Sequence, residues 1–104
     1  MKITSKQRAE LRAEAHHLTA LVHVGQHGLT DAIRTTLDEA LRTHELVKVQ
    51  LGKQVEIPAR EAAAQLAESV RADVVQVIGK TATFYRENRH LEKKKGALPP
   101  WRKQ

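Results

Sequence analysis

Segments whose apolar residues repeat with helical spacing alternate along this chain with segments typical of β-strands. This alternation is the feature that most limits which folds the chain can adopt. In chain order the segments span residues 5–17, 20–24, 31–44, 46–51, 58–70, 73–78 and 81–86. Helices between the first three strands imply crossover connections and parallel pairing, whereas the two-residue Gly79-Lys80 link predicts an antiparallel hairpin with a II′ turn. The predicted fold is therefore α/β, of order α-β-α-β-α-β-β, with a four-stranded mixed sheet packed against helices.

Capping residues and apolar spacing support these segments. Thr4 with Gln7 reads as a capping box, and Thr30 followed by Asp31 is a good start for the second helix. The run 46–51 alternates, so Val47, Val49 and Leu51 are expected to face the core. At the end of the last strand, Phe84 is expected in the core and Tyr85 on the surface.

Size and composition set the broad class. A chain of 104 residues makes one domain, which we place at residues 1–86, followed by a basic, mobile tail at 87–104. The absence of cysteine excludes disulfides, thiol chemistry and cysteine-based zinc sites. No apolar run suits a signal peptide or a membrane span, so a cytoplasmic protein with no membrane partner is expected.

The net charge of +6 and pI near 10.0 favour a nucleic-acid partner, but the charge is unevenly placed. Residues 86–104 hold seven Lys or Arg against two Glu, whereas residues 1–85 hold eleven Lys or Arg against ten acids. The domain must therefore gather its cations on one face if it binds RNA. The tail has two interpretations, an arm that adds affinity or a solubilising end, and Trp101 suits either docking on the domain or stacking on a base.

A Gly25-Gln26-His27-Gly28 loop joins the first strand to the second helix. Glycines let a backbone approach a ligand closely, and the helix directs N–H groups and its positive end toward the same place, which suits a phosphate. A plain strand-to-helix turn is the alternative reading. Neither Gln26 nor His27 supplies a permanent cation, so such a loop relies on backbone donors.

Nothing in the sequence indicates catalysis or a cofactor. The six histidines lack metal-ligand spacing, the serines lack a nucleophile context, and the acids form no general acid/base pair. We therefore expect no enzyme activity, no metal, no cofactor and no small-molecule substrate. Three aromatic residues make a poor stacking platform, so backbone and shape recognition of structured RNA is favoured over base stacking.

Five ordered segments carry a family resemblance. They read Lys6-Gln7-Arg8-x-x-Leu11-Arg12, Val24-Gly25-x-x-Gly28-Leu29-Thr30, Ala40-Leu41-x-x-His44-Glu45-Leu46-Val47-Lys48-Val49, Val75-Gln76-Val77-Ile78-Gly79-Lys80 and Tyr85-Arg86. Together, across residues 3–86, they resemble the CRM domain (chloroplast RNA splicing and ribosome maturation) in its stand-alone bacterial YhbY-like form. The resemblance implies a fold similar to the C-terminal domain of translation initiation factor 3. It also implies RNA binding through the GxxG loop and a basic surface, with precursors of the large ribosomal subunit as the associated RNA.

The sequence thus predicts a non-enzymatic factor that binds ribosomal RNA or pre-ribosomal particles during large-subunit assembly. The predicted RNA-binding residues are Gly25, Gln26, His27, Gly28, Lys2, Lys6, Arg8, Arg12, Arg34, Arg42 and Lys48. The four loop residues and the start of the second helix would donate hydrogen bonds, and the lysines and arginines would supply positive charge. An adaptor that contacts a ribosomal protein or GTPase without touching RNA is the alternative.

Overall fold

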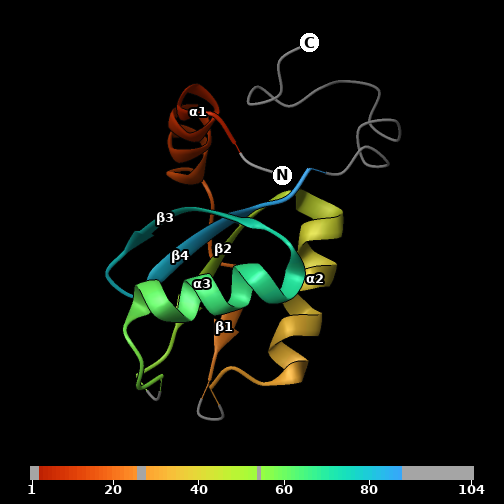
Figure 1. The fold of residues 1–104 in the computed structure, drawn as a ribbon, viewed down its shortest axis with the longest axis vertical. Coiled ribbons are helices and arrows are strands. Elements are labelled where there is room, and N and C mark those ends of the chain that lie inside the picture. The colour runs from red at the N-terminus through yellow and green to blue at the C-terminus, as the bar shows by residue number, and fades with distance from the viewer. Residues whose placement is uncertain (1–2, 26–27, 54, 88–104) are drawn as a thin grey trace.

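The computed structural model describes residues 3–25, 28–53 and 55–87, and its elements follow the predicted order (Figure 1). They are α1 (Ser5–Ala15), β1 (Val22–Val24), α2 (Asp31–His44), β2 (Leu46–Leu51), α3 (Ala59–Val70), β3 (Asp73–Ile78) and β4 (Thr81–Tyr85). The first helix is shorter than expected because its last turn tightens, with i→i+3 bonds from the N–H groups of His17 and Leu18. The tail from residue 88 onward, with Trp101, lies outside the described residues.

The strands form one mixed sheet in the order β1-β2-β4-β3. β1 runs parallel to β2, whereas β4 lies antiparallel between β2 and β3. The sequence predicts parallel pairing among the first three strands. This prediction is confirmed for β1 and β2 but is wrong for β3, which pairs with β4 instead. The two-residue turn keeps β4 beside β3, and β4 occupies the position between β3 and β2, so the α3 crossover skips one strand position. Gly79 has φ +57°, as a II′ turn requires at that position.

The predicted helix starts are confirmed. Thr4 Oγ1 accepts from Gln7 N–H at 3.1 Å, and Gln7 Oε1 accepts from Thr4 N–H at 2.9 Å. Thr30 Oγ1 accepts from Ile33 N–H at 3.2 Å. The second cap matters for the site, because it fixes where α2 begins after the glycine loop.

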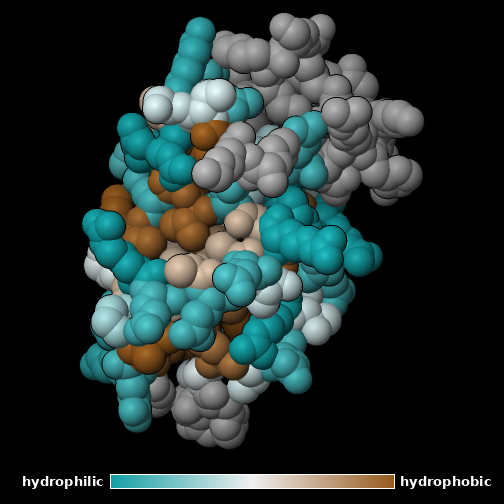
Figure 2. Space-filling view, viewed as in Figure 1, coloured by the Kyte–Doolittle hydropathy of each residue, from teal (hydrophilic) through white to brown (hydrophobic). Residues whose placement is uncertain are grey.

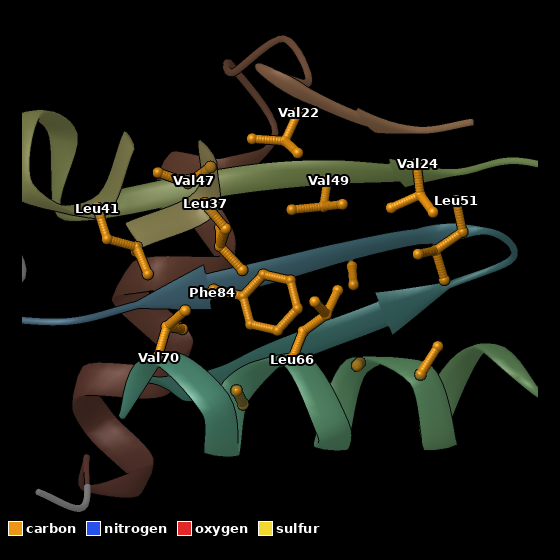
Figure 3. Packing of buried hydrophobic residues seen from close by; sticks show 14 of the residues in the cluster. Val22, Val24, Leu37, Leu41, Val47, Val49, Leu51, Leu66, Val70 and Phe84 are labelled. Atoms are coloured by element: carbon orange, nitrogen blue, oxygen red, sulfur yellow. The ribbon is translucent and has the colours of Figure 1, made fainter. Parts of the chain in front are cut away.

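Helices cover the two faces of the sheet unequally. α2 and α3 cover one face, where the main core gathers around the fully buried Phe84 (Figure 3). Val47, Val49 and Leu51 point into this core, as predicted. α1 packs on the other face, over a smaller cluster of Leu11, Leu46, Val75 and Tyr85.

Tyr85 corrects the sequence prediction, because it is buried rather than on the surface. Strand alternation correctly predicts that Tyr85 lies on the opposite face of the sheet from Phe84, but α1 covers that face at this position. α1 reaches only the end of the sheet where β2 begins and β4 ends. The rest of this side, which we call the open sheet face, carries His23, Lys48, Gln50, Gln76, Ile78 and Thr81.

Candidate nucleic-acid interface

A backbone hydrogen bond joins the two glycines of the loop just after β1. The N–H of Gly28 donates to the carbonyl of Gly25 at 3.0 Å, and the N–H of Thr30 donates to the carbonyl of Gly28 at 3.0 Å. Gly28 has φ +70°, a conformation that favours glycine. The predicted donors Gln26 and His27 lie outside the described residues.

Unlike Gly28, Gly25 does not have a backbone conformation that favours glycine. Its φ is not in the left-handed region, and a Cβ added to it would meet no described atom within 4 Å. Neither backbone conformation nor packing within the described chain therefore demands glycine at this position. A glycine that leaves space next to an exposed turn suits the close approach of a ligand.

The start of α2 beside this loop already carries a carboxylate. Asp31 lies in the first turn, with its side chain fully exposed, and pairs with Arg34 at 2.7 Å. The carboxylate balances the positive end of the helix, and Arg34 in turn balances the carboxylate. This helix end therefore adds little net positive charge for a phosphate, and the cations have to come from elsewhere.

Two lysines outside the predicted RNA-binding set, Lys53 and Lys80, lie at the same end of the sheet as the loop. Gly52 N–H donates to Val24 O at 3.0 Å, which holds the turn containing Lys53 beside the end of β1. Leu51 N–H donates to Lys80 O at 2.7 Å, which brings the β3–β4 turn there as well. Both lysine side chains are exposed. We call Gly25, Gly28, Lys53 and Lys80 the loop end; each lysine directly follows a glycine after a strand, which is the signal the sequence offered.

Lys48 is the one predicted cation on the open sheet face in the described chain. Its Nζ donates to the carbonyl of Leu18 at 3.3 Å, which ties β2 to the segment between α1 and β1. The side chain also borders two hollows, one toward Leu21 and the other toward Thr81. Lys48 is thus placed between the loop end and α1.

The predicted cations of α1 lie at the opposite end of the molecule from the loop (Figure 1). Lys6 and Arg12 are exposed there, and Lys2 lies outside the described residues. Five residue steps along β2 separate the two ends, which is about 16 Å. Arg8 reaches the free edge of β3, where its guanidinium donates to the carbonyls of Val74 and Val75.

Arg34 and Arg42 lie on the helical side of the sheet rather than on the open face. Arg34 borders a groove between α2 and α3 that Glu61 and Glu68 also line. Arg42 pairs with Asp38 at 3.3 Å. The structure therefore divides the described members of the predicted set among three surfaces: α1, the open sheet face and the helical side of the sheet.

Two structural features bear on other classes of function. None of the helices within residues 3–25, 28–53 and 55–87 is both long and apolar enough to cross a membrane. Over those same ranges, no three or more His, Asp or Glu side chains gather as a metal site would require.

Known proteins resemble this chain over nearly its whole length. The CRS1 / YhbY (CRM) domain family matches residues 3–86. The probable RNA-binding protein YqeI of Bacillus subtilis is 37% identical over 97 residues, covering 93% of this chain and 99% of YqeI. The probable RNA-binding protein PA4753 of Pseudomonas aeruginosa is 36% identical over 88 residues, 85% of each chain. The solution structure of SAV1595 from Staphylococcus aureus, a candidate RNA-binding protein, superposes with a TM-score of 0.73 at 32% identity, covering 84% of this chain and 91% of that one.

Proposed function

Because the chain belongs to the CRS1 / YhbY (CRM) domain family, we propose that it is a non-enzymatic RNA-binding protein that uses its loop end. The observation that carries this proposal is the unfilled space at Gly25 beside the exposed Lys53 and Lys80. Its proposed target is structured RNA of the large ribosomal subunit, bound in the cytoplasm during assembly. Family membership and the names of the relatives support RNA binding. The family resemblance in the five sequence segments supports the ribosomal target.

The loop end works by close approach and by charge. Gly25 lets an RNA phosphate come near the backbone, and residues 26 and 27 donate hydrogen bonds to it. Lys53 and Lys80 neutralise neighbouring phosphates, and each releases condensed counterions. Lys48 extends the contact along the open sheet face. Lys6 and Arg12 contact only an RNA long enough to reach α1, and Lys2 joins them in this proposal.

The salt dependence of RNA affinity tests this proposal. Phosphate-dominated binding predicts a log K that falls linearly with log salt, by about 0.7 per contact on a single strand and 0.9 on a duplex. The double variant Lys53→Ala with Lys80→Ala should reduce that slope by about 1.4 on a single strand. Arg71→Ala, which removes an exposed cation after α3, should leave it unchanged. A wild-type affinity that does not respond to salt contradicts the proposal.

Gly25→Ala separates ligand approach from folding. The added methyl meets nothing within 4 Å and the backbone needs no positive φ, so the melting temperature should stay within about 1 °C of wild type. RNA affinity should fall by about threefold to tenfold, because the methyl occupies the space that a phosphate needs. Gly28→Asn is the companion variant, since asparagine tolerates the left-handed conformation there better than alanine. An RNA affinity that is unchanged in Gly25→Ala would show that the loop is not part of the interface.

The identity of the RNA needs an experiment in cells. Ultraviolet crosslinking followed by sequencing should recover large-subunit ribosomal RNA with wild-type protein. The Lys53→Ala, Lys80→Ala variant should recover much less of it at equal protein abundance. Recovery confined to small-subunit or messenger RNA would retain RNA binding and reject the ribosomal target.

The adaptor alternative has one observation in its favour. Apolar side chains gather over β3 between α1 and α3 (Figure 2), where Ile78 is 60% exposed and Arg12 and Arg60 line a groove of about 480 Å³. Such a surface suits a partner protein with acidic and apolar residues. A pull-down from cell extract treated with ribonuclease tests it: ribosomal proteins retained after RNA digestion, and insensitive to Gly25→Ala, would favour the adaptor.

A further inference from the structure

A mostly apolar hollow lies on the α1 side of the sheet, at the far end from the glycine loop. The segment between α1 and β1, the end of α2 and the start of β2 meet there around a volume of about 280 Å³. Its lining consists of His17, Leu18, Thr19, Leu21, His44, Leu46 and Lys48. The volume is close to the lower limit of roughly 300 Å³ that small-ligand sites have.

Backbone pairing holds the walls of this hollow in place. Leu21 N–H donates to Lys48 O at 3.1 Å, so the chain before β1 continues along β2. Lys48 Nζ donates to Leu18 O at 3.3 Å, from across the hollow. The leucines therefore occupy a defined surface rather than the tip of a free loop.

Exposure of its leucines marks the hollow as unusual for this protein. Leu18 is 36% and Leu21 is 51% exposed, and with Ile78 they are the exposed large hydrophobic residues of the described chain. Leu46, buried to 3% exposure, forms the floor between them. Exposed apolar residues that share one concave surface are more informative than the same residues scattered singly.

The rim is polar and carries no acid. Lys48 supplies a positive charge, and His17 and His44 supply flat imidazole rings on the two sides. RNA bases that leave their stack bind against aromatic or imidazole rings and apolar side chains, with their phosphate on a nearby cation. The hollow offers all three kinds of contact, and charge complementarity with Lys48 favours a polyanion over a neutral ligand.

We infer that this hollow binds one unstacked nucleobase of the RNA that the loop end holds by its phosphates. The inference rests on the proposed RNA-binding function and extends it from backbone contact to base contact. Lys48 exchanges its bond with Leu18 O for the phosphate next to that base. The base contact comes from leucine and histidine, so it needs no exposed aromatic residue on the strands.

Leu21→Ser tests the base contact, because the side chain is half exposed and its backbone bond to Lys48 is unaffected. The probes are a fluorescein-labelled uridine RNA of about ten nucleotides and an abasic RNA of the same length. Leu21→Ser should weaken binding of the uridine RNA by about fivefold, since the base loses an apolar contact. It should leave the salt slope and the binding of the abasic RNA unchanged. Lys48→Ala should instead reduce the slope by about 0.7 with both RNAs.

Ile78→Ser is the matched control, because Ile78 is equally apolar, more exposed and outside this hollow. It should not change the preference for uridine RNA over abasic RNA. The inference is overturned if Leu21→Ser has no effect, if it weakens both RNAs equally, or if Ile78→Ser has the same effect. Wild-type protein that binds neither RNA overturns the proposed function as well, so the two failures are distinct.

The chain's own tail is the competing occupant, and Trp101 reports on it. Trp101 is the single tryptophan of the chain, so its fluorescence is unambiguous. With a nucleobase as the occupant, Leu21→Ser leaves the Trp101 emission of the RNA-free protein unchanged. A shift of that emission to longer wavelength in Leu21→Ser would show that the tail fills the hollow and would overturn the inference.

Discussion

Arg86, the residue after β4, ties the end of that strand to the middle of α2 and to the end of α3. It donates to Asp38 Oδ1 at 2.7 Å and Asp38 O at 3.0 Å in α2, and to Val70 O at 2.7 Å at the end of α3. The backbone N–H of Arg86 donates to Glu45 O at 3.0 Å, which extends the pairing of β4 by one residue. Arg86 belongs to the segments that carry the family resemblance, although no local pattern explains why an arginine stands there. The reason is structural, because these partners lie 48 residues (Asp38), 41 residues (Glu45) and 16 residues (Val70) before Arg86 in the chain, beyond any local pattern.

Arg86→Lys should therefore destabilise the fold although it retains the charge. An ammonium group cannot reproduce the planar fork that reaches Asp38 and Val70 together. Hydrogen bonds to charged groups contribute about 1.5–3 kcal/mol, and the pair is partly solvent-exposed, so we expect a loss near the lower end, about 1.5 kcal/mol. Urea unfolding measures this, with Arg60→Lys, an exposed residue of α3, as the control. Equal stability of the two variants would contradict the role given to Arg86.

Among the elements, α1 shows where sequence patterns stop being sufficient. Its cap is predictable locally, and so is an apolar stripe of Leu11, Ala15 and Leu18. Leu11 and Ala15 are buried, whereas Leu18 lies beyond the end of the helix and is 36% exposed. Which surface the stripe covers is a tertiary property, because a strand pattern does not reveal whether its second face is covered. Tyr85 was misassigned for that reason. The expected parallel pairing of β3 is wrong for a similar reason, since a helical crossover fixes the direction of a strand but not how many strand positions it skips.

Leu11→Ala should detach α1 without unfolding the rest. Leu11 is fully buried but belongs to a cluster separate from the core around Phe84. Removing it should cost about 2–4 kcal/mol of local stability. Native-state hydrogen exchange should show α1 amides losing protection while those of β2 and α2 retain theirs, and Arg12→Ala should change neither. Loss of protection that is uniform over the chain would mean that α1 is part of the main cooperative unit.

For the whole molecule, net charge was predictable and its placement was not. The two glycines of the loop follow from sequence, since they stand between a strand and a helix. Lys53 and Lys80 join them only because β1, β2 and the β3–β4 hairpin end at one edge, which the sheet order decides. Arg34 and Arg42 leave the open face because α2 covers the opposite one. The candidate interface is therefore a product of topology more than of local sequence.

The cations of the loop end and those of α1 lie at opposite ends of β2, a strand about 16 Å long, so we expect the length of an RNA to decide which of the two groups contributes to binding. An RNA of about four nucleotides covers roughly 10 Å when stacked and can occupy only one end. Lys53→Glu with Lys80→Glu should therefore weaken binding of both that RNA and one of about twenty nucleotides. Lys6→Glu with Arg12→Glu should weaken only the longer RNA. Since the ends share no contacts, the losses in binding free energy should add within about 0.5 kcal/mol when all four changes are combined on the longer RNA. Equal sensitivity of the short RNA to both pairs would show that α1 binds RNA independently of the loop end.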